Sequence, residues 1–171
     1  FSTCFRREAG SYGKDVKGIL RVHQFDKVEM VSFTRPEDTD KEHESLLLIE
    51  EGIMKDLKIP YQVIKMCTGD LGASAARKYD IEAWMPAQNT YRETHSTSNC
   101  TDFQARRLNI KLRRKGQLEF VHTLNGTVMA IGRMLIAILE NNQKKDGSVE
   151  IPKALQKYCG FKSIKPTKTS K

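Results

Sequence analysis

The sequence GTVMAIGRMLIAILENN, residues 126–142, decides the fold that we expect. Its larger apolar residues recur at helical spacing: Val128, Ile131, Leu135, Ile138 and Leu139. This pattern predicts an amphipathic helix over 126–142, for which Asn125 is available as an N-cap. The longest apolar run, 134–139, is far shorter than the roughly 20 residues of a membrane span. We therefore expect a soluble protein with no membrane segment.

The chain on either side of this helix alternates between extended and helical patterns. Extended segments are expected at 1–8 and 19–33, with a loop containing Gly10, Gly13 and Gly18 between them, and at 61–67, 79–85 and 103–113. A helix is expected over 36–58, because it opens with Arg-Pro-Glu-Asp and has Leu46, Ile49, Ile53 and Leu57 at helical spacing before Pro60. Residues 115–117 fit a hairpin turn. The order strands, helix, strands, helix predicts an α+β fold, with a mainly antiparallel sheet flanked by helices.

Composition narrows the class of protein. The chain has 171 residues, of which 39% are hydrophobic and 29% charged, which is enough for one globular core and argues against disorder. Its net charge of +8, with a basic cluster at 106–115, suggests a polyanionic partner. The four cysteines form no CxxC pair, so neither a zinc site nor a disulfide framework is expected, and a reducing cytoplasm fits best.

Several charged residues lie in surroundings unusual for charge. Alternation places Glu29 on one strand face with Val31 and Phe33, where a carboxylate is costly unless a cation or donors meet it. Arg6, Arg21 and Arg133 are embedded in extended or apolar segments, and their guanidinium groups could converge on phosphate. The alternatives are a Glu29 that reaches solvent from an edge strand, and arginines that are ordinary surface charges.

The polar stretch 89–96 combines a carboxylate with hydroxyl groups, which suits a hard cation such as Mg²⁺, although polar loops often have this composition. The glycines near Ser11 match neither GxxxxGK[ST] nor GxGxxG, so side chains would have to hold any bound ATP. There is no Gly-x-Ser-x-Gly elbow.

Taken together, these segments resemble the seryl-tRNA synthetases, a family of class II aminoacyl-tRNA synthetases. FRREAGSYG at 5–13 and GILRVHQFDKVE at 18–29 are similar to the second signature motif of class II, and LNGTVMAIGR at 124–133 to the third. Further similar strings are CTGDLG at 67–72, WMPAQNTYRE at 84–93 and SNCTDFQARR at 98–107. The resemblance implies a partial class II catalytic core over 1–158, followed by a basic C-terminal tail over 159–171.

The resemblance also implies roles for single residues. Arg6 would hold the ATP α-phosphate and the serine carboxylate, Glu8 would face the adenine amino group, and Arg21 would support the bent triphosphate. Phe25 would stack on adenine, and Arg133 would contact the γ-phosphate; Arg6 and Arg133 are the implied catalytic residues.

The remaining implied roles concern serine and the metal. Glu29 would accept the serine ammonium, and Thr127 would lie near the serine hydroxyl. Glu93 and Ser96 would ligate Mg²⁺, and the whole segment Glu93, Thr94, His95 and Ser96 would belong to the ATP site.

The implied reaction is serine activation by ATP, followed by transfer to the 3′ end of serine tRNA in a homodimeric enzyme. The first signature motif, the serine-binding loop and the tRNA-binding arm of the family would precede Phe1, so we expect this chain to be an inactive fragment on its own. Two alternatives are a related amino acid:carrier-protein ligase, which would be zinc-dependent, and a non-catalytic RNA-binding paralogue.

Overall fold

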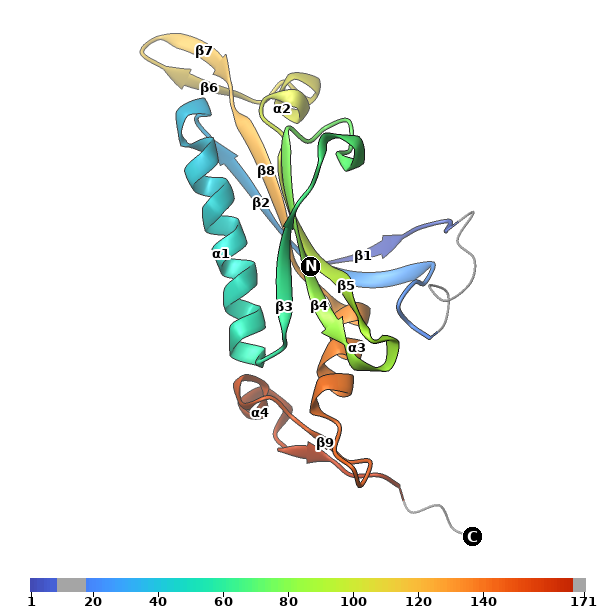
Figure 1. Ribbon diagram of the computed structural model, residues 1–171. Coiled ribbons are helices and arrows are strands. Elements are labelled where there is room, and N and C mark those ends of the chain that lie inside the picture. The colour runs from blue at the N-terminus through green and yellow to red at the C-terminus, as the bar shows by residue number, and fades with distance from the viewer. Residues whose placement is uncertain (9–17, 168–171) are drawn as a thin grey trace.

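A six-stranded antiparallel sheet, with strand order β1-β2-β8-β5-β4-β3, organises the computed structural model (Figure 1). The structure describes residues 1–8 and 18–167. The strands of the sheet are β1 (Ser2–Phe5), β2 (Gln24–Thr34), β3 (Tyr61–Lys65), β4 (Arg77–Met85), β5 (Thr90–Asn99) and β8 (His122–Ala130). Two small sheets lie outside it and pair β6 (Lys111–Arg114) with β7 (Gln117–Phe120), and β9 (Val149–Glu150) with β10 (Ser163–Ile164). The predicted α+β class with a mainly antiparallel sheet is confirmed.

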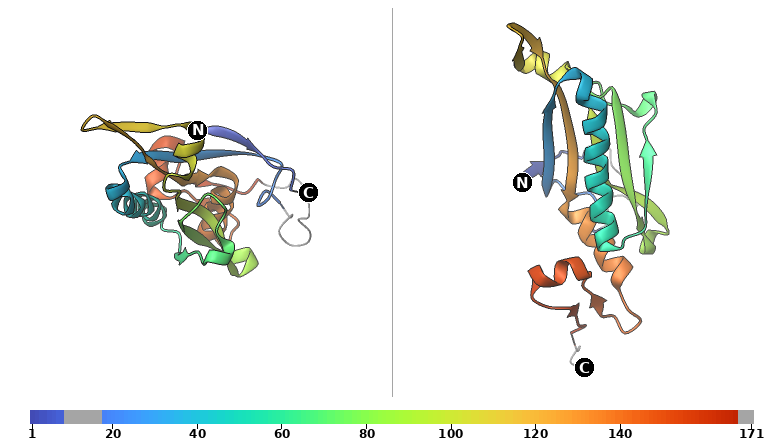
Figure 2. Two further views of the ribbon diagram at one scale, coloured as in Figure 1. Left: turned by 90° about the horizontal axis from the view of Figure 1, so that it is seen from above. Right: turned by 90° about the vertical axis from the view of Figure 1, so that its left-hand side faces the viewer.

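In the described ranges, four α-helices accompany these strands. They are α1 (Thr39–Leu57), α2 (Phe103–Leu108), α3 (Ile131–Asn142) and α4 (Lys153–Cys159), and the short 3-10 helices are η2 (Pro36–Asp38), η3 (Thr68–Asp70) and η4 (Pro86–Gln88). Helix α1 runs along the sheet, and α3 continues from the end of β8 (Figures 1 and 2). No helix in the described part of the chain is long and apolar enough to cross a membrane.

The hydrophobic core lies between one face of the sheet and the helices α1 and α3. Met54 of α1, Ile81 and Met85 of β4, and Met134 of α3 are almost completely buried and belong to one cluster. Strand residues alternate between faces, so the sequence neighbours of Ile81 within β4, Asp80 and Glu82, point to the opposite face. We call the face covered by α1 the helix face and the opposite one the site face.

Two of the predicted elements need correction. The helix expected over 126–142 begins only at Ile131, because residues 126–130 pair with β2, and the expected cap Asn125 is a strand residue. The strand expected over 103–113 is wrong in its first half, which forms α2. Within that helix the Arg107 guanidinium stacks on the Phe103 ring one turn earlier, and Arg106 pairs with Asp102.

The other expected elements are found with shifted ends. Residues 36–58 form η2 and α1, 61–67 and 79–85 contain β3 and β4, and the turn at 115–117 joins β6 to β7. Segments 1–8 and 19–33 contain β1 and β2. The expected loop glycines Gly10 and Gly13 lie outside the described residues. Strand β5 and helix α4 were not predicted.

Candidate functional site

Two β-bulges on neighbouring strands bring the polar residues to one face. Between β2 and β8, Val28 pairs with Met129 and Glu29 with Thr127, so Val128 is the extra residue. This shift puts Thr127 directly opposite Glu29 on the site face. Bulges are common beside binding sites, because they redirect side chains in this way.

The second bulge lies between β4 and β5. Ile81 pairs with His95 and Glu82 with Glu93, which leaves Thr94 as the extra residue. Asp80 pairs with Ser96, and Asp80 and Glu82 share the site face. Glu93 and Ser96 therefore point to the same face, although a spacing of three in a regular strand would put them on opposite faces.

A pocket opens on the site face where β1, β2, β5 and β8 meet the first turn of α3. Most of the predicted site residues line it: Arg6, Glu8, Arg21, Phe25, Glu93, Thr94, Ser96, Thr127 and Arg133. Lys27, Ala130, Gly132 and residues 19, 20 and 22 complete the lining. Of the predicted residues, Glu29 and His95 do not line the pocket.

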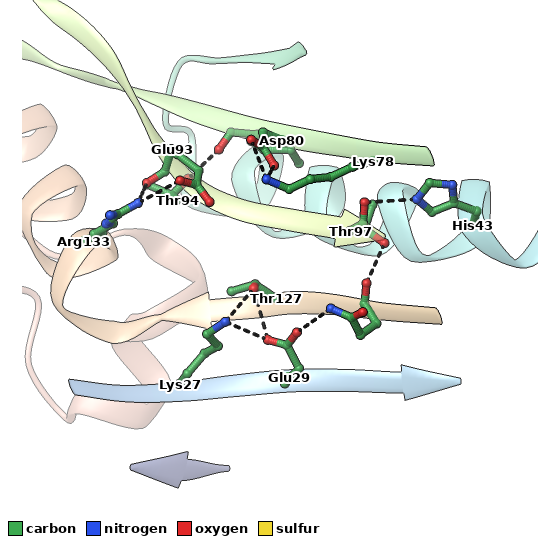
Figure 3. Close-up of polar contacts among 12 residues, drawn as sticks. Lys27, Glu29, His43, Lys78, Asp80, Glu93, Thr94, Thr97, Thr127 and Arg133 are labelled. Carbon is green, nitrogen blue, oxygen red and sulfur yellow. Dashed lines mark hydrogen bonds and ion pairs between the residues drawn. The ribbon is translucent and has the colours of Figure 1, made fainter. Parts of the chain in front are cut away.

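Glu29 nevertheless contacts the pocket wall through its neighbours (Figure 3). The Asn125 amide donates to Glu29 Oε1 at 3.0 Å, and the Thr127 hydroxyl donates to Oε2 at 3.1 Å. Lys27 Nζ lies 3.2 Å from Oε2 and donates to Thr127 Oγ1 at 3.3 Å. The carboxylate thus has both a cation and donors, so the alternative of a charge that simply reaches solvent is wrong.

Lys27 and Asn125 are site residues that sequence reasoning missed. The signal for Lys27 was available, because it lies two residues before Glu29 and strand alternation places both on one face. The bulge follows Val28 and does not alter this relation within β2. For Asn125 the sequence pattern points elsewhere, because the helical spacing of the residues that follow predicts an N-cap and not a strand residue beside Glu29.

Arg133 lies in the first turn of α3 and contacts both β5 and the segment that precedes β2. Its Nη1 donates to the main-chain oxygen of Glu93 at 2.7 Å and lies 3.3 Å from Glu93 Oε2 (Figure 3). Its Nε donates to the Leu20 carbonyl at 3.4 Å. The preceding Gly132 permits this approach, because a Cβ there would lie 3.2 Å from the Ile19 carbonyl oxygen. Arg133 therefore points into the pocket and not to open solvent.

The ends of β1 and β2 supply the other two arginines. Arg21 pairs with Glu8 at 2.8 Å. The Arg6 main-chain N–H donates to the His23 carbonyl at 2.9 Å, and the Arg6 guanidinium carbon lies 5.5 Å from the centre of the Phe25 ring. All three arginines predicted to converge on phosphate thus line one pocket.

Thr94 and His95 are buried within the sheet. The Thr94 hydroxyl donates to the Ile81 carbonyl at 3.3 Å and lies 2.9 Å from His95 Nδ1. Burial lowers the pKa of His95 to about 4, so the ring is neutral at pH 7. Any contribution of His95 to a ligand site would come from its main chain or from its packing.

Glu50 of α1 lies directly behind the site, on the helix face. It is fully buried, and a Cβ on Gly126 would lie 2.9 Å from Glu50 Oε1. Burial, together with the charges of Glu29 and Asp80, raises the pKa of Glu50 to about 8. The carboxyl is therefore mostly protonated at neutral pH.

The residues proposed to hold Mg²⁺ have suitable chemistry. Glu93 offers a carboxylate and Ser96 a hydroxyl on one face, and Mg²⁺ prefers such hard oxygen ligands. The described residues contain no cluster of three or more His, Cys, Asp or Glu side chains able to hold a metal. An ion at this position would resemble the nucleotide-associated Mg²⁺ sites, in which waters and substrate phosphates supply the remaining ligands.

Comparisons with known proteins agree with this geometry. Residues 1–142 match the family model of the tRNA synthetase class II core domain (G, H, P, S and T). A serine–tRNA ligase of Dictyoglomus thermophilum is 59% identical over 98% of this chain and 40% of its own length, and one of Pyrococcus furiosus is 57% identical over 97% and 37%. The crystal structure of seryl-tRNA synthetase from Pyrococcus horikoshii complexed with ATP superposes with a TM-score of 0.94, at 55% identity over 97% of this chain and 38% of that one. The chain thus spans about two fifths of the length of these relatives.

Proposed function

Because the chain belongs to the family of class II tRNA synthetase core domains, we propose that it carries the ATP and serine sites of a serine–tRNA ligase. One observation supports this most strongly: a carboxylate held by Asn125, Thr127 and Lys27 borders a pocket lined by Arg6, Arg21 and Arg133. An anionic group suits the ammonium of an amino acid, and three guanidinium groups suit a triphosphate.

For ATP, we assign phosphate contacts to Arg6, Arg21 and Arg133. Phe25 offers an aromatic face for adenine, and Glu8, beside Arg21, offers acceptors for its amino group. Glu93, Thr94 and Ser96 of β5 also line the pocket, and His95 would act through the packing of β5. In this arrangement the three guanidinium groups surround one pocket, from the end of β1, the segment before β2 and the first turn of α3.

For serine, we assign the ammonium to Glu29 and the hydroxyl region to Thr127. The serine carboxylate is already anionic and nucleophilic at neutral pH, so its attack on the α-phosphorus requires no general base. The chemistry then depends on positioning and on neutralising the charge of the α-phosphate and the departing pyrophosphate. Removing one such cation is expected to cost on the order of a hundredfold in rate.

We propose that Glu93 and Ser96 ligate Mg²⁺ together with the ATP phosphates. A bound Mg²⁺ would supply Lewis-acid stabilisation of phosphate charge. Arg133, which pairs with Glu93, would then share that carboxylate with the ion or turn towards the γ-phosphate.

The second half-reaction would transfer the seryl group to the 3′-terminal adenosine of serine tRNA. The net charge of +8 favours such a polyanionic partner. We further propose a homodimer and a cytoplasmic location for the full-length protein, as the resemblance to the family implies.

Serine-dependent exchange of pyrophosphate into ATP by the full-length protein tests the first step, and charging of serine tRNA tests the second. Exchange with serine and not with alanine or threonine is the expected result. A protein that activates serine but loads a carrier protein instead of tRNA would support the carrier-protein ligase alternative. Absence of serine-dependent exchange would contradict both the serine–tRNA ligase function and a carrier-protein ligase that activates serine.

A further inference from the structure

Lys27 makes contacts with the groups to which we have assigned serine. Its ammonium lies 3.2 Å from Glu29 Oε2 and 3.3 Å from Thr127 Oγ1, while the other carboxylate oxygen, Oε1, is taken by Asn125 (Figure 3). Oε2 also accepts from the Thr127 hydroxyl, so three groups contact this carboxylate. Lys27 is the primary ammonium among them, and a substrate ammonium could replace it in kind.

The lysine head group and the serine α-ammonium are chemically alike. Both are primary ammonium groups with one positive charge and three N–H donors. Lys27 also lines the pocket to which we have assigned ATP, and its four-carbon stem has several rotatable bonds, so the head group can move without a change in the backbone.

We infer that Lys27 occupies the ammonium position in the substrate-free site, and that serine binds by displacing the Lys27 ammonium towards the ATP phosphates. This inference rests on the proposed function. Without nucleotide, the displaced lysine loses its carboxylate and gains no anion. With nucleotide bound, a phosphate replaces the carboxylate, so ATP strengthens the binding of serine through Lys27.

Because coupling between two ligands is reciprocal, it can be measured from the serine side alone. The experiment is calorimetric titration of serine into the full-length protein, with and without α,β-methylene-ATP and Mg²⁺, an analogue that cannot release pyrophosphate. In the unchanged protein we expect the analogue to tighten serine binding about fivefold or more, the lower end of ordinary coupling. In Lys27→Met we expect tighter serine binding without the analogue, and a coupling below about twofold.

Lys78→Met is a matched control. Lys78 pairs with Asp80 at 2.9 Å, and the two lie two residues apart on the site face of one strand, as Lys27 and Glu29 do. The Lys78 side chain is 22% exposed, against 23% for that of Lys27. Lys78 does not line the pocket in which Lys27 lies. We expect this variant to keep the coupling of the unchanged protein.

A second variant, Lys27→Gln, keeps a polar donor for Glu29 and guards against loss of fold in the methionine variant; it is expected to lose the coupling as well. The inference is overturned if serine binds more weakly to the Lys27 variants without nucleotide, or if they retain the coupling. Failure of the proposed function looks different, because then the unchanged protein would neither bind serine nor show serine-dependent exchange.

Discussion

At the scale of single residues, the positive charge of Arg133 is expected to increase the rate of serine activation. Arg133→Ala removes a cation that lies beside Glu93 and is proposed to contact the γ-phosphate. We expect the rate of pyrophosphate exchange to fall tenfold or more, since about 1.4 kcal/mol corresponds to each factor of ten. The control is Arg107→Ala, because Arg107 lies on α2 with its guanidinium over Phe103. Unchanged kinetics in Arg133→Ala with an intact fold would contradict the assignment.

Glu29 is expected to act on serine and not on ATP. Glu29→Gln keeps the shape of the side chain and one acceptor oxygen, for either the Thr127 hydroxyl or the Asn125 amide, but it removes the negative charge that attracts an ammonium. We expect the KM for serine to rise about tenfold or more, while the KM for ATP changes little. Steady-state exchange kinetics with each substrate varied in turn measure both constants. An equal rise in the two would indicate that Glu29 only supports the sheet.

Residue-level reasoning from the sequence located charges better than it located their partners. The three arginines and Glu29 stand out because they interrupt apolar or extended stretches, and the structure gathers them at one pocket. It did not identify Lys27 as the cation at Glu29. The bulges at Val128 and Thr94 could not be foreseen either, because the hydrogen bonds of a neighbouring strand determine them.

At the scale of elements, helix α1 carries a carboxyl group whose ionisation opposes folding. The pKa of Glu50 is about 8 in the folded protein against 4.5 for the unperturbed group. The folded state holds the proton more tightly, so the stability that protonated Glu50 contributes is complete below pH 4.5 and is lost as the pH rises through 8. At about 1.4 kcal/mol per pKa unit, the loss amounts to a few kcal/mol.

Glu50→Gln is uncharged at every pH and should escape this loss. Thermal unfolding followed by circular dichroism is expected to give similar Tm values for the variant and the unchanged protein at pH 5, and a higher Tm for the variant at pH 9. Asp56→Asn, a change at an exposed carboxylate on the same helix, provides the control. A difference in Tm that does not grow with pH would show that Glu50 is paired or solvated.

The elements most easily predicted are those with one clean periodicity. Helix α1 has apolar residues at regular spacing, and β3 and β4 are bounded by proline, glycine and turn residues. Strand β5 lacks this signal, because its buried residues Thr94, His95 and Thr97 are polar. The two threonine hydroxyls donate to the main-chain carbonyls of Ile81 and Asn125. The segment 126–130 was assigned to a helix because Val128 fits both periods, and only its pairing with β2 decides between them.

At the scale of the whole molecule, the site face leaves apolar side chains uncovered on the part of β2 that extends beyond its pairing with β1. Val31 and Phe33 of β2 are 64% and 56% exposed. We expect the 171-residue chain to self-associate through this surface, since exposed apolar residues near a free strand edge favour pairing with other chains. Sedimentation velocity should show a sedimentation coefficient that rises with concentration.

The double variant Val31→Lys with Phe33→Lys should abolish that rise. Leu48→Lys serves as its control, because Leu48 is 63% exposed but lies on α1, on the other side of the sheet. A chain that remains monomeric at all concentrations, or a double variant that associates as strongly as the unchanged chain, would contradict the prediction.

The two faces of the sheet also differ in how strongly a substitution on each affects the stability of the fold. Packing between α1, α3 and the helix face holds the domain together, so substitutions at Met54, Ile81 or Met134 remove tightly packed volume and lower stability. The charged residues of the pocket, such as Arg21 and Glu93, are only partly buried, and exchanging them costs the fold less. A lineage carrying this domain could therefore alter which amino acid it accepts by drift on one face, while purifying selection on the other face keeps the molecule folded.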